Sequence, residues 1–140
     1  MKTNTMRTRT LAATGLAALA VTGCGGGSSD GSNAKRFSGD QREVARVVDA
    51  LQSAARSGDA HKICSKLLTG NLAGEIGARG GTSCEAQVKR QLVSDGETLA
   101  VRRLVVRGTV AVATVREQNR KLSQLVFHRQ GGGWRVSGIE

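Results

Sequence analysis

The sequence predicts an α+β fold in which three N-terminal helices pack on a curved antiparallel sheet of about four strands. Apolar residues recur at helical spacing between residues 40 and 92, whereas short β-rich runs follow from residue 98 onward. The connections between these runs are too short for a crossover helix, so neighbouring strands must be antiparallel. The chain has 140 residues. Because its first two dozen differ from the rest, one folded domain of about 100 residues is expected, over residues 38–140.

Residues 1–23 have the pattern of an export signal, in which basic residues precede an uncharged run rich in Leu and Ala, Leu11 to Thr22. As a helix this run is too short to cross a bilayer. The residues that follow, "VTGC" from Val21 to Cys24, resemble the lipobox of bacterial lipoproteins. The resemblance implies cleavage before Cys24, its acylation with palmitate or a similar chain, and a lipid anchor on the extracytoplasmic face of the cell membrane. The alternative is an ordinary signal peptide with a chance cysteine at the cleavage site.

Residues 24–37 are predicted to be the acylated cysteine and a flexible linker, because Gly25 to Asn33 is rich in Gly and Ser. Without the three basic residues of the signal peptide, 18 of the 21 Lys and Arg remain against 11 Asp and Glu, a net charge of +7. Outside the cytoplasm, nucleic acid is not the expected partner of such a chain. Anionic lipid headgroups, cell-wall polymers and a plain solvated surface are the alternatives.

The first helix is predicted to begin at a D-x-x-E capping box formed by Asp40 and Glu43 and to end at Gly58. A second helix, capped by Asp59, is predicted over residues 60–70. Apolar residues at helical spacing form one face of the first helix: Val44, Val47, Val48, Leu51 and Ala55.

Residues 71–82 are predicted to be a Gly-rich loop with one short turn at most. A second capping box, the T-x-x-E that starts at Thr82, is predicted to begin a third helix. On that helix Cys84, Val88 and Leu92 are spaced four residues apart, so they share one face.

Four β-rich runs complete the chain and predict a four-stranded meander: "TLAVRRLVVRG", "TVAVATVRE", "KLSQLVFHR" and "WRVSGIE". The segments "LVV" and "LVF" within them are apolar on both faces of a strand. If the outer face of the sheet is as apolar as these segments indicate, the domain is expected to pair face to face as a homodimer.

An opening helix "VARVVDALQSAARSGD", a cysteine in the second and third helices and a final "GGWRV" strand together resemble the small NTF2-like lipoproteins of high-GC Gram-positive bacteria. The similarity covers Asp40 to Ile139. It implies the cone of the NTF2, ketosteroid-isomerase and SnoaL-like superfamily, in which a bent sheet wraps a long helix and leaves an apolar pocket at its wide end. The chain departs from this pattern because no strand pair is evident between the second and third helices.

His128 and Trp134 are the candidate ligand-binding residues, and no catalytic residue is predicted. Enzymes of the superfamily use a pocket acid or base with a Tyr or Asp donor, and this chain has no Tyr. His128 is expected to be half-exposed on the outer sheet face, and Trp134 to be a core plug rather than a platform for a ligand. The alternative function is a pocket enzyme of isomerase or dehydratase type with its site near His128.

No metal site and no cofactor are predicted. His61 and Cys64 are spaced H-x-x-C, but the C-x-x-C and paired-histidine spacings typical of zinc sites do not occur. The favoured function is a non-catalytic module, lipid-anchored outside the cytoplasm, that binds a small apolar ligand or a cell-envelope protein.

Cys64 and Cys84 are predicted to form a disulfide. Export places them in an oxidising compartment, and acylation of Cys24 leaves an even pair. Each shares a helix face with apolar residues, so both are expected at one seam between helices. Two separate buried thiols are the alternative.

Overall fold

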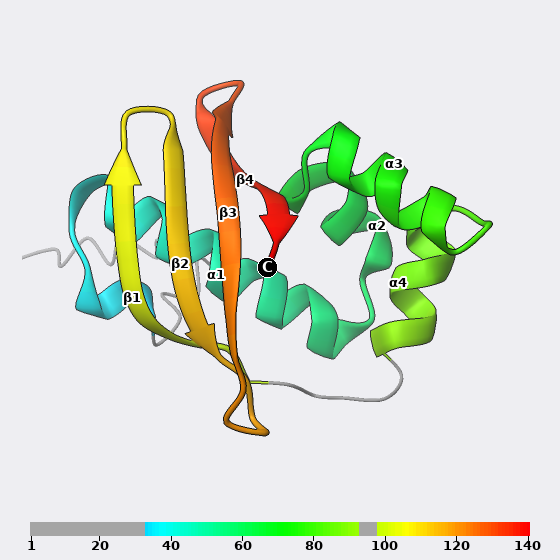
Figure 1. The fold of residues 1–140 in the computed structure, drawn as a ribbon, viewed down its shortest axis with the longest axis horizontal. Helices are drawn as coiled ribbons and strands as arrows, with labels where there is room; N and C mark the ends of the chain where they lie inside the picture. The colour runs from blue at the N-terminus through cyan, green and yellow to red at the C-terminus, as the bar shows by residue number, and fades with distance from the viewer. Residues whose placement is uncertain (1–32, 93–97) are drawn as a thin grey trace, which may run out of the picture.

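The computed structural model describes residues 33–92 and 98–140. The predicted signal peptide, Cys24 and most of the predicted linker lie outside this range. The predicted α+β fold class is confirmed, because helices pack on one face of an antiparallel sheet of four strands. In Figure 1 the long helix α1 lies behind the sheet, and the shorter helices gather beyond the β4 edge. This is the arrangement that the NTF2-like resemblance implies.

Helix α1 spans Gly39–Ser57, close to the prediction, and ends at Gly58 in the left-handed conformation. The predicted capping box at its start is wrong. Ser38 occupies the N-cap position and makes no side-chain cap. The carboxylate of Asp40 instead accepts a hydrogen bond from the Arg129 guanidinium, with 2.6 Å between Oδ1 and Nη2. Because Asp40 pairs with Arg129 on β3, its side chain does not cap the helix as the local sequence predicts.

The predicted second helix is divided in two. Asp59 caps α2 (Ala60–Lys62) as expected, since its side chain accepts from the Lys62 amide. The chain then widens into a π-helical turn, η2 (Ile63–Leu67), and leaves the helix at Leu68. There the Thr69 amide donates to the Val136 carbonyl at 2.8 Å. Leu68 and Val136 form an isolated parallel bridge at the free β4 edge of the sheet.

The loop predicted over residues 71–82 is wrong, because most of it is a helix, α3 (Gly70–Arg79). Thr69 caps this helix by accepting from the Leu72 amide. Glycine is a poor helix former, but Gly77 is needed where α3 meets the chain that leads into α4. A Cβ at this position would lie 2.8 Å from the Thr82 carbonyl oxygen.

The predicted third helix is present as α4 (Cys84–Leu92). Its cap is not the predicted Thr82 but the next residue. The Ser83 hydroxyl accepts a hydrogen bond from the Ala86 amide at 3.2 Å. The predicted N-cap therefore lies one residue before the observed one, Ser83.

The sheet is the predicted meander, with strand order β1-β2-β3-β4 and antiparallel neighbours throughout. Its hairpins turn tightly. Gly131 and Gly132 both have positive φ, 57° and 78°, as a two-residue type I′ turn between β3 and β4 requires. Bulges interrupt the register after Val101 and after Val126 and curve the sheet. The strands are β1 (Ala100–Arg107), β2 (Val110–Arg116), β3 (Leu122–Gln130) and β4 (Gly133–Ile139).

The core lies between α1 and the inner face of the sheet. The chain has few aromatic residues, so valines fill most of this space around one central phenylalanine. The largest fully buried side chains are Phe127, Val44, Val48, Val101, Val115 and Val136.

The domain begins before residue 38, so the predicted end of the linker is wrong. Asn33 and Ala34, next to the short helix η1 (Ala34–Arg36), are 3% and 1% exposed. The buried carboxylate of Asp49 accepts hydrogen bonds from the side chain of Asn33 and from the Ala34 amide. Asn33 looks like linker in sequence, but its partner stands 16 residues later.

Candidate functional site

The outer face of the sheet, on the side away from α1, is not covered by any described helix (Figure 1). Alternate residues of each strand point to this face. The register places Val105 opposite Val112, Val112 opposite Val126, and Val126 opposite Gly138. We call these four residues the valine row. It crosses the whole sheet, and all its members are half-buried.

Polar and basic side chains flank the valine row on both sides. The neighbouring cross-strand row toward the β1–β2 turn holds Arg107, Val110, His128 and Arg135, and the row on the other side holds Arg103, Thr114 and Gln124. None of these residues is a carboxylate. The face therefore combines an apolar stripe with a positively charged border, as an interaction surface does.

His128 lies on this outer face and is exposed, as predicted. Its Nδ1 is 2.7 Å from the Ser137 hydroxyl, which in turn donates to the Val126 carbonyl at 3.2 Å. A hydroxyl has one proton, so both contacts are satisfied when Nδ1 carries the imidazole proton and donates to Ser137. In this arrangement His128 does not act as a base toward the hydroxyl.

Trp134 is only 4% exposed and forms part of the core on the inner face, so its place is that of a core plug and not of a ligand platform. The Arg129 guanidinium covers its ring, with 4.8 Å between Cζ and the ring centroid. The Nε1 atom is buried without a hydrogen-bond partner in the described part of the chain. The two candidate ligand residues thus lie on opposite faces of the sheet and do not form one site.

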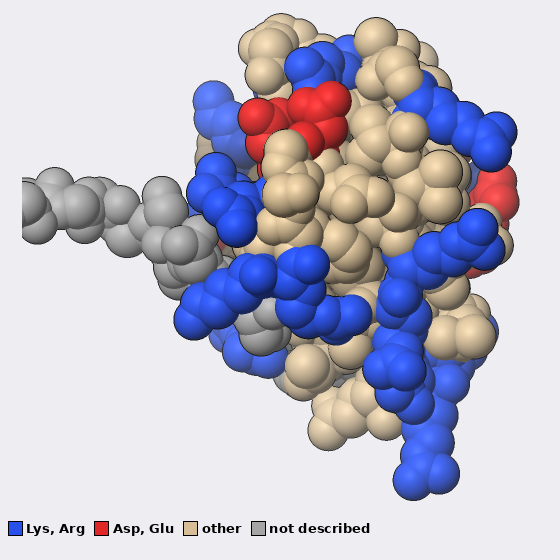
Figure 2. Space-filling view, turned by 90° about the vertical axis from the view of Figure 1, so that its left-hand side faces the viewer, with Lys and Arg blue, Asp and Glu red and all other residues tan. Residues whose placement is uncertain are grey.

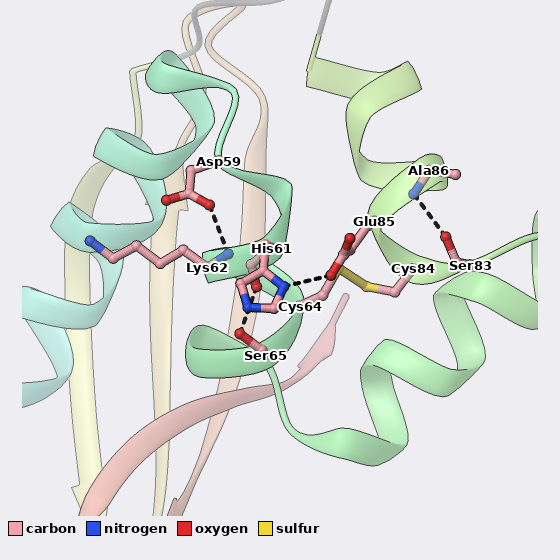
Figure 3. A network of polar contacts seen from close by, with 9 residues as sticks. All are labelled: Asp59, His61, Lys62, Cys64, Ser65, Ser83, Cys84, Glu85 and Ala86. Atoms are coloured by element: carbon pink, nitrogen blue, oxygen red, sulfur yellow. Dashed lines mark hydrogen bonds and ion pairs between the residues drawn. A yellow bond between two sulfur atoms is a disulfide. The ribbon is translucent and has the colours of Figure 1, made fainter.

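The predicted disulfide is present. Cys64 and Cys84 are joined, with 6.1 Å between their Cα atoms, and connect η2 to α4. Figure 3 shows a second link beside it, between His61 and Glu85. Imidazole Nδ1 and carboxylate Oε1 are 2.7 Å apart, and the two side chains are 75% and 44% exposed. This cluster fastens the short helices to one another and faces solvent.

Metal-ligand clusters and membrane-spanning helices are both absent from the described residues. Within residues 33–92 and 98–140, His, Cys, Asp and Glu side chains nowhere gather in threes as metal ligands would. The helices of the same range are also too short or too polar to cross a bilayer.

Sequence reasoning missed the serine beside His128. Ser137 reaches the histidine because β4 has a bulge there, which the alternation of apolar and polar residues does not reveal. It also missed the pairing of Asn33 with Asp49, for which an asparagine at the end of a Gly/Ser-rich segment was the only local signal.

Comparison with protein-family models and with curated proteins gives no match. Among solved structures, the chain is similar to a protein of Xanthomonas campestris described as a calcium/calmodulin dependent protein kinase II association domain. The identity is 16%, the TM-score is 0.45, and the alignment covers 74% of this chain and 86% of the other. So low a score says nothing about activity or partners.

Proposed function

We propose that this protein is a lipid-anchored extracytoplasmic module whose NTF2-like domain is not an enzyme and binds a cell-envelope protein through the outer face of its sheet. The observation that carries the proposal is the valine row. Three half-buried valines lie side by side across a sheet face that no described helix covers. Contiguous apolar surface of this kind marks interaction sites in soluble domains.

The anchoring and the location are supported by two independent features. The "VTGC" segment at Cys24 has the order of residues of a lipobox. The Cys64–Cys84 disulfide is a bond that persists in oxidising compartments and is rare in the cytosol.

The charge of the outer face favours a different protein over a second copy of this chain. Arg103 and Arg107 border the valine row, whereas the Arg135 guanidinium donates to the Ser65 and Leu68 carbonyls. Face-to-face pairing would bring two such borders together, and like charges at an interface oppose association. A partner with an apolar ridge and an acidic rim fits better. The homodimer remains a prediction that the molecular mass tests.

The second candidate function, an isomerase-like or dehydratase-like enzyme, is favoured by the contact between His128 and Ser137. Against it stand the exposure of His128 and the hydrogen bond in which the Ser137 hydroxyl donates to the Val126 carbonyl and not to the imidazole. General acid–base chemistry relies on a positioned group, commonly one that burial has tuned.

The test is photo-crosslinking in the native cell. A benzophenone side chain at Val112, in the centre of the valine row, is expected to form one adduct of defined mass, and the same probe at exposed Ser53 on α1 is the control. Val126→Lys places a charge beside the probe and is expected to abolish the adduct. Equal adducts from both probe positions, or none from Val112, would contradict the proposal. An adduct of twice the chain mass would identify a second copy instead.

A further inference from the structure

One edge of the domain forms a basic surface, which we call the basic edge. It consists of the exposed Lys and Arg residues of η1 and of the first turn of α1, together with the arginine at the bulge of β1. Figure 2 shows Lys and Arg side chains over much of this side of the molecule, with acidic side chains gathered near its top. The members of the basic edge are Lys35, Arg36, Arg42 and Arg102.

Hydrogen bonds hold the three elements of the basic edge together. The Asn33 side chain donates to the Leu99 carbonyl and accepts from the Val101 amide, both at 2.9 Å. Gln41 donates to the Leu104 carbonyl at 3.1 Å. Because these bonds fix η1 and the start of α1 along the free edge of β1, the charges form one rigid surface.

The carboxylates of the same elements are engaged elsewhere. Asp49 is buried and accepts from Asn33 and Ala34. Asp40 and Glu43 face Arg129 on β3, at 2.6 and 3.7 Å. Asp40 and Glu43 thus share one guanidinium, so together they leave one negative charge near the four positive charges of the basic edge.

The basic edge lies next to the residue at which the described chain begins. Cys24 precedes Asn33 by nine positions, and nine residues span at most about 30 Å when fully extended. An acylated Cys24 would thus keep the basic edge within about 30 Å of the bilayer surface, so that contact with the headgroups needs no diffusion from solution.

We propose that the basic edge docks on the anionic phospholipid headgroups of the membrane that holds the anchor. The chemistry is recognition of phosphodiesters by Lys and Arg, and the occupant is the bilayer rather than a soluble anionic polymer. The inference rests on the proposed function because the anchor supplies the bilayer. Docking along the β1 edge leaves the outer sheet face pointing sideways, so the valine row stays open to a partner in the same membrane.

The experiment measures binding of the unacylated mature chain, residues 24–140 with Cys24→Ser, to vesicles by sedimentation. The probes are vesicles of phosphatidylcholine with and without phosphatidylglycerol, and soluble poly(glycerol phosphate). A triple variant, Lys35→Gln, Arg36→Gln and Arg102→Gln, removes charges from the basic edge. The matched control, Lys62→Gln, Lys66→Gln and Lys89→Gln, removes as many charges from exposed positions on α2, η2 and α4. Circular dichroism checks that both variants fold.

The unsubstituted chain is expected to bind the anionic vesicles only, and more weakly as salt rises. Each basic residue near the surface contributes about fivefold in affinity, so the basic-edge variant is expected to lose on the order of 100-fold, and the control only a few-fold. Equal losses in both variants, no binding to anionic vesicles, or equally tight binding to the soluble polymer would overturn the inference. None of these results depends on acylation, so they are separate from a failure of the lipid anchor.

Discussion

The helical lobe, residues 59–92, and the sheet region, residues 33–58 with 98–140, are held together by different means. All six of the largest fully buried side chains lie in the sheet region. The side chains that the helical lobe buries, such as Ile63 and Leu68, keep slightly more exposure, and its helices are joined by the Cys64–Cys84 disulfide and by the contact of His61 with Glu85. Packing therefore stabilises both regions, and the helical lobe has a covalent link in addition.

Phe127→Ala is expected to have the largest effect, because this side chain is 0% exposed at the centre of the sheet region. Removing a buried phenylalanine costs about 3–5 kcal/mol of unfolding free energy. Urea denaturation followed by circular dichroism measures it. Phe37→Ala, at the half-buried edge of the core, is the control and is expected to cost clearly less. Equal losses at the two positions would show that the core is not centred on Phe127.

Cys64→Ala is expected to lower the free energy of unfolding by about 3 kcal/mol, since the bond closes a loop with a sequence separation of 20. Cys84→Ala and the double variant are expected to cost about the same, because each removes the same bond. Hydrogen exchange should show the loss of protection in α3 and α4 first, with the strands still protected. Uniform loss over both regions would contradict the comparison.

Asn33→Ala is expected to cost about 1–3 kcal/mol, because it leaves the buried Asp49 carboxylate and the edge of β1 short of partners. A double-mutant cycle with Asp49→Asn measures the coupling between the two residues by thermal unfolding. If the losses of unfolding free energy from the two substitutions add, the two residues are not coupled, and this pair does not hold the N-terminal segment on the domain.

His61→Ala is expected to have the smallest effect, below about 1 kcal/mol, since its contact with Glu85 is exposed to solvent. Thermal unfolding with the disulfide intact measures it. A loss as large as that of Cys64→Ala would show that the ion pair, rather than the covalent bond, fastens the lobe.

The sequence allowed the sheet region to be predicted better than the helical lobe. Alternation along β2 and helical spacing along α1 report burial directly, so both elements were found close to their bounds. Helix α3 was not found, because Gly70, Gly74 and Gly77 lower its helix propensity and its support comes from tertiary contact with the chain before α4.

Only part of the candidate site could be predicted, because the rest depends on contacts between segments far apart in the sequence. The apolar "LVV" and "LVF" segments indicated a second apolar sheet face, but only the strand register joins Val105, Val112 and Val126 into one row. The disulfide was predicted from the even number of cysteines that remains in a chain expected to be exported and acylated at Cys24. The Asp49 network and the contact of His128 with Ser137 depend on residues far apart in sequence or on a bulge, which local patterns do not encode.

The central claim is that the domain is held at a membrane through Cys24, and labelling of cells with radioactive palmitate tests it most directly. The wild-type protein is expected to take up label and to sediment with membranes. Cys24→Ser is expected to take up none and to leave the membrane fraction or be mislocalised, while residues 33–140 keep their thermal unfolding transition. Absence of label on the wild-type protein would contradict the account.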